Sequence, residues 1–355
     1  MTGPRLGFFS RLLEDAPAAD RYRFAIEQIV QAERVGFASA WVAQHHFGED
    51  EGGLPSPFVL LAAAAAQTSR IALGTAVLTL PIDDPVRAAE DAAVLDHMSG
   101  GRVQLGVAAG GTPSSFAAFG RDPAARRAIF ADHLAVFADA LAGRSLRGTD
   151  SRMYPAGGSL GERIWQATFS ADGGARAGAR GDGLMLSRTQ PRPGLPIDAP
   201  LSAVQLPIIE AYRAALPDAA VPRILASRTA VVVDPEDRTR VLESAREPLR
   251  RLVETTFGVD ASGVGLDDLV RLTDTHIGTA DEVVASLAAD GAIAAATDVT
   301  FQVHSVPATH ETTLRSIELL ATEVAPQLGY AVGAEAASAL AAAHHSLTTT
   351  SEATS

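Results

Sequence analysis

The sequence predicts a single α/β domain, a (β/α)8 TIM barrel with insertions at its rim. Apolar runs of strand length alternate with helical segments, and strict alternation indicates a parallel sheet because parallel neighbours need a crossover connection. Eight such units are the number that closes a barrel. An open doubly wound sheet is the alternative. That fold calls for a glycine-rich phosphate loop after the first strand, and residues 11–15 (Arg-Leu-Leu-Glu-Asp) contain no glycine.

The strands are expected at residues 5–10, 40–44, 71–80, 103–108, 163–167, 184–187, 224–233 and 298–304. The helices are expected at residues 20–36, 57–68, 85–99, 122–142, 171–180, 201–216, 235–257, 279–289 and 309–327. Local signals mark the first three helices. The first stops at Gly36, the second opens on Pro57, and the third ends at Gly100 and Gly101. The later helices follow the helical spacing of their apolar residues.

Residues 1–328 are expected to form the barrel, and residues 329–355 an Ala/Ser/Thr-rich tail that is mobile. Two segments, 188–200 and 258–277, are longer than usual barrel connections. Both would lie on the catalytic rim, where long loops act as lids or as walls of the substrate pocket.

Composition excludes several classes of function. The 355-residue chain has 29 basic and 42 acidic residues and a net charge of -13, so nucleic acid is not an expected partner. It has no cysteine, which excludes disulfides, thiolate nucleophiles, iron-sulfur clusters and zinc sites built on sulfur. No signal peptide or membrane-spanning segment is recognisable, so we expect a soluble, cytoplasmic protein without a membrane partner.

The stretch Trp41–Phe47, Trp-Val-Ala-Gln-His-His-Phe, reads as a buried strand that ends in two histidines. Active sites of barrels lie at the carboxyl ends of the strands, so His45 is the candidate catalytic residue, a proton donor or acceptor near neutral pH. His46 points to the other side, and its role stays open. A metal site from both histidines and the acidic residues 49–51 would be a poor chelate, so no metal is expected.

Two further stretches suit a flat phosphorylated ligand. Residues 74–81 end the third strand with small side chains, which leave room for a ring system against the backbone, although plain barrel packing would use them equally well. Residues 170–174, Ser-Ala-Asp-Gly-Gly, precede a helix, and their backbone N–H groups could bind a phosphate. A simple helix cap is the alternative, and Asp172 is an unfavourable neighbour for a phosphate.

Together these motifs resemble the bacterial luciferase-like family of flavin-dependent monooxygenases. The matching segments are 41–47, 74–77 with 80–81, 84–91, 95–96 with 98–102, 106–107 and 277–282. The similarity is dense over residues 5–120 and continues in register to about residue 328. The runs Pro-Val-Arg-x-Ala-Glu-Asp and Ser-Gly-Gly-Arg are specific to this family.

The resemblance implies a (β/α)8 barrel that binds reduced FMN, supplied by a separate flavin reductase, and uses O2 to oxygenate a small, largely apolar organic substrate. His45 matches the family's catalytic histidine. Ala76 and Val77 match a peptide that is often a non-prolyl cis bond beneath the flavin ring, while Ser170 and Gly173 match positions that hold the phosphate. The resemblance also implies a homodimer.

One departure concerns the phosphate. Ala109 occupies the position of an arginine that contacts the phosphate in the luciferase large subunit, so another cation is needed here. Arg176 and Arg188 are the nearest in sequence. The position of the luciferase's reactive cysteine is Ala108, and the acid before the phosphate serine is replaced by Phe169. Light emission is therefore not implied.

Three other functions remain open. A deazaflavin-dependent dehydrogenase would use the same barrel for hydride transfer without oxygen, and its acidic cofactor tail would favour a basic channel, which the Arg-poor residues 108–112 do not provide. A flavin-binding partner subunit without turnover is the second, and retention of His45 argues against it. A metal-dependent hydrolase is the third.

Overall fold

A computed structural model describes residues 3–48, 51–303, 306 and 309–333 of the chain. In this part of the chain the strands are β1 (Arg5–Ser10), β2 (Ser39–Val42), β3 (Ala72–Thr79), β4 (Val103–Ala108), β5 (Ile164–Ala167), β6 (Gly183–Leu186), β7 (Ile224–Val232), β8 (Thr275–Gly278) and β9 (Asp298–Gln302). All pair in parallel in the order β6-β5-β4-β3-β2-β1-β9-β7-β8, and a further β6–β7 pairing closes the sheet. Eight strands, β1 to β7 and β9, therefore form a closed barrel, which confirms the predicted fold.

The ninth strand, β8, corrects the prediction that residues 258–277 form a loop. These residues contain the helix α9 (Leu266–Leu272) and, in their last part, the strand β8. β8 pairs with residues 229–232 of β7, on the edge opposite β9 and beyond residues 224–226, which pair with β6. The barrel strand β7 is long enough to serve two partners in succession, so β8 lies outside the barrel.

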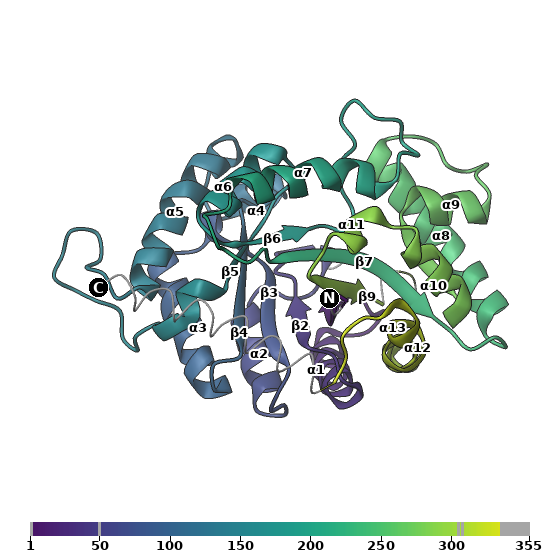
Figure 1. Ribbon diagram of the computed structural model, residues 1–355, viewed down its shortest axis with the longest axis horizontal. Coiled ribbons are helices and arrows are strands. Elements are labelled where there is room, and N and C mark those ends of the chain that lie inside the picture. Colours follow the sequence, from purple (N-terminus) through teal and green to yellow (C-terminus); the bar gives the residue numbers. More distant parts are fainter. Residues whose placement is uncertain (1–2, 49–50, 304–305, 307–308, 334–355) are drawn as a thin grey trace.

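Helices surround the strands (Figure 1). They are α1 (Ala18–Val35), α2 (Pro57–Ala65), α3 (Pro85–Ser99), α4 (Pro113–Ala118), α5 (Arg126–Leu141), α6 (Ala171–Ala179), α7 (Leu201–Ala215), α8 (Arg238–Phe257), α9, α10 (Ala280–Ala288), α11 (Gly291–Ala294), α12 (His310–Leu319) and α13 (Ala325–Leu328). Single 3-10 turns cover Leu80–Ile82, Pro123–Ala125 and Gly158–Arg163, and a π-turn, Leu320–Val324, joins α12 to α13. The short α4 and α11 carry no amphipathic repeat long enough to predict.

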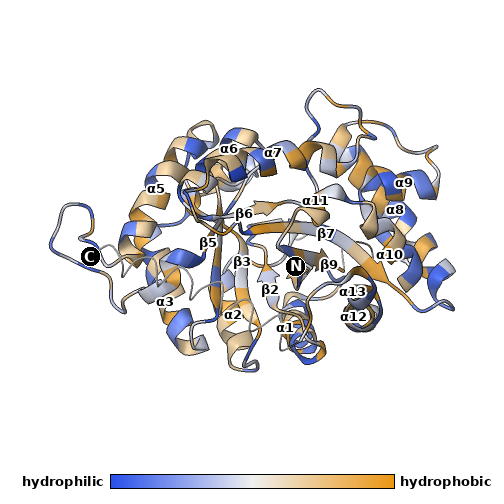
Figure 2. Cartoon of the chain, in the orientation of Figure 1, coloured by the Kyte–Doolittle hydropathy of each residue, from blue (hydrophilic) through white to orange (hydrophobic). Residues whose placement is uncertain are grey.

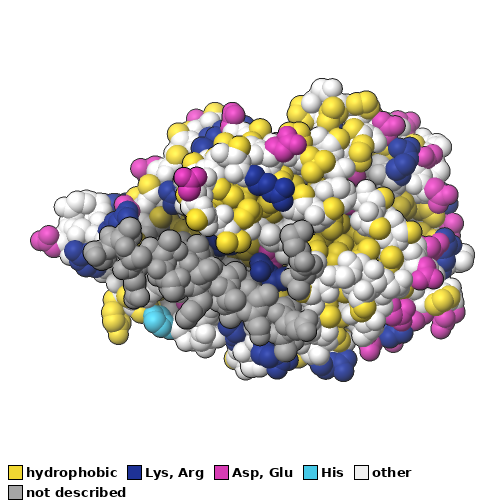
Figure 3. All heavy atoms as spheres, viewed as in Figure 1, with side chains coloured by type: hydrophobic (Ala, Val, Ile, Leu, Met, Phe, Trp, Pro, Cys, Tyr) yellow, Lys and Arg dark blue, Asp and Glu magenta, His cyan; other side chains and the backbone are white. Residues whose placement is uncertain are grey.

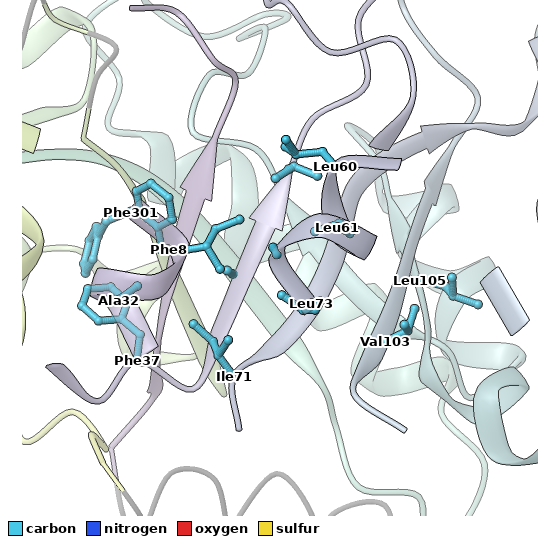
Figure 4. Packing of buried hydrophobic residues seen from close by; sticks show 14 of the residues in the cluster. Phe8, Ala32, Phe37, Leu60, Leu61, Ile71, Leu73, Val103, Leu105 and Phe301 are labelled. Atoms are coloured by element: carbon cyan, nitrogen blue, oxygen red, sulfur yellow. The ribbon is translucent and has the colours of Figure 1, made fainter. Parts of the chain in front are cut away.

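The main core lies between the strands and the helices around them. Outward side chains of the strands, such as Phe8, Leu73 and Phe301, meet residues of α1 and α2 (Figure 4). Hydrophilic residues lie mostly on the outer helices and loops (Figure 2). Acidic and basic side chains gather at the end of the molecule formed by α8, α9 and α10 (Figure 3), where α8 carries several ion pairs between its own successive turns.

A second layer of packing fills the inside of the barrel. Trp41 and Trp165 meet edge to face, with ring centroids 5.7 Å apart. Each indole lies over a glycine, since a Cβ on Gly74 would fall 2.1 Å from Trp41 and one on Gly183 would fall 2.2 Å from Trp165. With Met185 and other side chains these rings close the middle of the barrel, so a ligand can enter only at an end.

The segment that follows α13 is partly described. Tyr330 is buried, and Ala331 exchanges backbone hydrogen bonds with the chain around β1, donating to Pro4 at 3.0 Å and accepting from Leu6 at 3.2 Å. The first residues of the predicted tail therefore pack on the barrel, and residues 334–355, where the tail is expected to be mobile, lie outside the described residues. None of the described helices is both long and apolar enough to cross a membrane.

Candidate active site

The loop after β2 is fastened to the end of β3 by one side chain. Gln44 is buried, and its Oε1 accepts the backbone N–H of Thr79 at 2.7 Å. Its Nε2 donates to the carbonyl of Pro55 at 3.3 Å and to the carboxylate of Asp83 at 3.2 Å. These bonds fix the loop that carries His45, although β2 itself ends at Val42, earlier than predicted.

His45 lies at the mouth of the barrel. Its backbone N–H donates to Leu54 at 2.9 Å, and its Nδ1 is 3.8 Å from a carboxylate oxygen of Glu51. The chain returns over the ring at Gly52, which has φ of +128° and on which a Cβ would be 3.1 Å from His45 Cδ2. Glycine is therefore required there, because both the backbone angle and the close approach exclude a side chain. The side chain of His45 is 25% exposed.

The surroundings of His45 disfavour its charged form. Burial lowers its pKa from 6.5 to about 4, and the positive charges of Arg11, His46 and Arg188 add to the effect. The imidazole is therefore neutral at neutral pH. It can accept a proton from a reacting group, or donate its one ring N–H as a hydrogen bond, without first losing a proton.

Two arginines face the same space from opposite sides. Arg11 follows β1 and donates to the backbone carbonyl of Glu51. Arg188 follows β6, is only 7% exposed, and donates to the hydroxyl of Thr229 on β7 at 3.3 Å. Burial, and then the charge of Arg11, lower the pKa of Arg188 to about 9. The mouth of the barrel therefore concentrates positive charge in a protein that is acidic overall.

The floor of this space is apolar. Phe9, Ala76, Val77 and Ala167 are half-buried and rest on the tryptophan layer inside the barrel. The Ala76–Val77 peptide bond is cis. Between the paired positions 75 and 78, β3 carries one residue more than β4 does. Ala76 and Val77 therefore leave the regular pairing of the two strands. The result is a shelf of small side chains at the carboxyl ends of the strands, where a flat ring can lie.

The loop between β5 and α6 begins beside this shelf. The Ser170 hydroxyl caps α6 by accepting the N–H of Gly173 at 3.2 Å, and Thr168 Oγ1 accepts the N–H of Ser170 at 3.2 Å. A Cβ on Gly173 would be 1.9 Å from Thr168 Oγ1, so glycine is needed. The backbone N–H groups of Ala171 and Asp172 have no acceptor among the described residues and point from the helix start, where an anion is favoured.

Comparison with known proteins adds one decisive finding. The model of the luciferase-like monooxygenase family matches residues 7–297, which is most of the chain. The chain belongs to the luciferase-like monooxygenase family. The family resemblance predicted from the motifs is therefore confirmed.

Individual relatives cover less of the chain. Limonene 1,2-monooxygenase from Rhodococcus erythropolis is 32% identical over 174 residues, which are 47% of this chain and 45% of that protein. The chain spans half or less of the length of the curated relatives first matched.

Solved structures match nearly the whole fold at low identity. One is the oxygenating constituent of 3,6-diketocamphane monooxygenase from Pseudomonas putida, a type II Baeyer-Villiger monooxygenase in complex with FMN (TM-score 0.71, 21% identity, 92% of this chain and 99% of that one). Another is an F420-dependent secondary alcohol dehydrogenase in complex with an F420-acetone adduct (TM-score 0.70, 21% identity, with the same coverage). The family fold thus serves more than one flavin-type cofactor.

The remaining residues predicted from the family pattern lie in different places. Ala109 is half-exposed directly after β4, and Gly110 turns the chain there with φ of +74°. Arg176 is exposed in the last turn of α6 and has no ion pair in the described part of the chain. The structure thus brings His45 and Arg188 to one space and leaves Arg176 on the surface.

His46 belongs to a separate aromatic group at the rim. Its ring meets Phe119 edge to face at 4.9 Å and lies 5.8 Å from Phe47, which is 72% exposed. Burial lowers the pKa of His46, opposed by the charge of Asp83. In the residues that the structure describes, no group of three His, Asp or Glu side chains could hold a metal; Glu49 and Asp50 lie outside them.

The sequence did not single out three residues of this site. Gln44 is the last residue of one predicted strand and Arg11 directly follows another, so a search for polar residues at the ends of the strands would have found both. Gln302 ends β9 and was contained in a predicted strand as an ordinary residue. Its burial, with no partner for its amide, is visible only in three dimensions.

Proposed function

We propose that the protein is an FMN-dependent monooxygenase that uses reduced flavin and O2 to oxygenate a small organic substrate. The observation that carries the proposal is the position of His45, a neutral histidine at the barrel mouth beside the shelf formed by Phe9, Ala76, Val77 and Ala167. Family membership supports it, because related monooxygenases use this barrel for oxygen insertion.

The residues present fit a phosphorylated flavin. The shelf at Ala76 and Val77 is flat and apolar enough for the ring system, and the start of α6 offers two unused N–H donors for the phosphate. Ser170 and Gly173 shape that helix start, and Arg176 is the nearest cation on the same helix. When bound, reduced FMN would supply the electrons that activate oxygen.

His45 then moves a proton close to the ring. Because its imidazole is neutral, it can accept a proton from the substrate or donate its ring N–H as a hydrogen bond, and the carboxylate of Glu51 lies 3.8 Å from Nδ1. The two long rim segments would limit the access of water to this space. Arg192 of one segment forms an ion pair with Asp274 of the other, and its guanidinium lies 5.1 Å from the ring centroid of Phe257.

A deazaflavin-dependent dehydrogenase is the second candidate. Arg11 and Arg188 give the mouth of the barrel a basic character that suits a cofactor with an acidic tail, which was not expected from the Arg-poor sequence after β4. A catalytically silent flavin-binding subunit is the third. It has no structural observation in its favour, since the neutral histidine and the open shelf are both in place.

The test compares both cofactors without oxygen and then with it. The protein is titrated anaerobically with reduced FMN and with reduced F420, and oxygen is then admitted while the absorption spectrum is followed. We expect tighter binding of reduced FMN and a transient spectrum that differs from both reduced and oxidised flavin. Tighter binding of F420, with no reaction with oxygen, would indicate that the protein is a dehydrogenase that transfers hydride. Binding of FMN with no oxygen consumption on any substrate would favour the silent subunit.

The partners are part of the same proposal. A separate flavin reductase, expected from the family resemblance, would supply reduced FMN. A homodimer is proposed from the family alone. Native mass spectrometry of the purified protein measures the oligomeric state directly, and a monomer would overturn that part.

A further inference from the structure

Arg188 is a buried cation without a carboxylate. It is only 7% exposed, and its one acceptor in the described part of the chain is the Thr229 hydroxyl at 3.3 Å. Arg163 and Arg228 are buried to a similar degree, and each pairs with an aspartate, at 2.7 Å and 2.6 Å. Buried charges are normally paired, because the loss of hydration is otherwise not offset. An anion beside Arg188 would offset this loss of hydration.

The guanidinium reaches the inner wall of the barrel. On β7, Leu225 faces the interior tryptophan layer, and the residues two and four positions further along face the same side. These are Ser227 and Thr229, so Arg188 meets β7 on its inner face. Thr229 lies in register with Gln302 of β9, and Gln302 also lies in register with Phe9 of the shelf.

Gln302 supplies the second, independent observation. Its side chain is fully buried, and neither Oε1 nor Nε2 has a partner in the described residues. The hydroxyl of Ser227 is likewise buried without one. An unpaired buried amide costs free energy comparable to a lost hydrogen bond, so such groups indicate a missing ligand or water. Donors from two strands and one rim loop thus converge on one place.

We propose that Arg188 and Gln302 bind the carboxylate of an anionic organic substrate at the inner edge of the barrel mouth, with its apolar part over the shelf near His45. This inference rests on the proposed function for the reaction and narrows its substrate class to organic acids. A guanidinium holds a carboxylate through two parallel N–H donors, and the Gln302 Nε2 adds a third. The sequence predicts a largely apolar substrate, and this proposal adds a carboxylate at one end of it.

The flavin phosphate is the other anion that could occupy this place. The unused N–H donors of α6 follow β5, whereas Arg188 is directed to β7 and acts electrostatically on Arg11 and His45. In the described residues, no hydrogen bond or ion pair joins Arg188 to residues 168–173. We therefore assign the phosphate to the start of α6 and the carboxylate to Arg188.

The test measures binding without turnover. Isothermal titration calorimetry compares butanoate, hexanoate and octanoate with their amides on the intact protein, on Arg188→Gln and on the surface control Arg34→Gln. Because charge-assisted hydrogen bonds are strong, we expect the wild type to prefer at least one acid over its amide by about tenfold. Arg188→Gln should lose that preference and Arg34→Gln should keep it. No preference at any chain length, or an unchanged preference in Arg188→Gln, would overturn the assignment.

Two further measurements separate binding of the acid from loss of folding and from binding of the flavin phosphate. Gln302→Leu replaces an unpartnered amide with an apolar group of similar size, so it should fold, melt no lower than the wild type and bind the preferred acid several-fold more weakly. Affinity for oxidised FMN is measured on the same variants. A large loss of FMN affinity in Arg188→Gln, without an acid preference in the wild type, would make the flavin phosphate the anion. These assays need neither reductant nor oxygen. The carboxylate site can therefore be disproved while the oxygen chemistry of the proposed function is found, and the oxygen chemistry can be disproved while the carboxylate site is found.

Discussion

The side-chain oxygen of Gln44 accepts the backbone N–H of Thr79 at 2.7 Å, and this bond joins the end of β2 to the end of β3. The first of these strand ends leads to His45, and the second carries the cis peptide between Ala76 and Val77. The amide of Gln44 thus helps to hold the loop that carries His45 against the strand that carries Ala76 and Val77.

Replacing Gln44 with alanine should lower the free energy of unfolding by about 1–3 kcal/mol, because Thr79 N–H and the Pro55 carbonyl lose their partner in a buried place. Chemical denaturation measures this change. Gln67→Ala, at an exposed position, is the matched control and should stay within about 0.5 kcal/mol of the wild type. Equal effects of the two substitutions would show that the loop is not held in this way.

His45→Ala should reduce turnover by about a hundredfold or more, the usual contribution of a positioned acid or base. Affinity for FMN should change little, because the ring shelf and the helix start are built from other residues. Steady-state oxygen consumption and fluorescence titration with FMN measure the two quantities. His97→Ala, an exposed histidine on α3, is the control. Unchanged turnover in His45→Ala would remove His45 from the mechanism.

The low pKa of His45 makes stability depend on pH. The folded protein binds a proton on His45 only near pH 4, whereas the unfolded chain does so near its ordinary value of 6.5. The free energy of unfolding should therefore fall as pH decreases from about 6.5 to about 4, since the unfolded state takes up the proton first. Denaturation of wild type and His45→Gln across this range tests the sign, and the variant should show the shallower decline. Buried His276, whose pKa is also lowered to about 4, contributes to both curves.

The effect of each neighbouring charge on the pKa of His45 should also be measurable separately. Arg11 and Arg188 lower its pKa, His46 adds to their effect, and Glu51 lies closest to Nδ1. Removing one positive charge in Arg188→Gln should raise the pKa of His45, which NMR titration of the ring proton reports. The control Arg34→Gln changes an exposed residue in the last turn of α1 and should leave the pKa of His45 unchanged. A lower pKa in Arg188→Gln would contradict this electrostatic picture.

The barrel could be predicted from sequence because alternation of apolar runs is a local signal, and each barrel strand carries one. β8 could not, because its residues, 275–278, form too short a run and depend on the last residues of β7, 229–232, for pairing. The same limit applies to the site. The position of His45 follows from its place after a strand, whereas the burial of Arg188 against Thr229 depends on two segments 41 residues apart.

Ser170→Ala tests the start of α6. It removes the cap on Gly173 N–H and should lower stability by about 1 kcal/mol. Asp84→Ala removes the cap of α3 on the N–H groups of Val86 and Arg87, and should destabilise by a similar amount. If the phosphate binds at α6, only Ser170→Ala should also weaken FMN binding. An equal loss of FMN affinity in both variants would attribute the effect to stability alone.

The motif that most clearly marks the family has a structural role in this protein. Asp96 and Arg102 lie in the runs that carried the resemblance, yet both are at the end of the barrel away from His45. Asp96 binds the buried Arg163 at 2.7 Å, while Arg102 donates to the carbonyls of Ala65 and Ile71. These bonds hold α2 and α3 to the start of β4. A residue pattern can therefore be specific to a family without touching its chemistry.

Asp96→Asn should accordingly destabilise the fold and spare the site. It leaves Arg163, which is only 3% exposed, as a buried charge without a carboxylate, and breaking such a pair costs about 3–5 kcal/mol. Glu90→Gln breaks the exposed pair with Arg87 and should cost less than about 1 kcal/mol. Chemical denaturation compares the two, and FMN affinity is measured at a temperature where both variants are folded. A normal free energy of unfolding for Asp96→Asn would mean that the carbonyls of Gly101 and Val103, which also accept from Arg163, are sufficient to hold it.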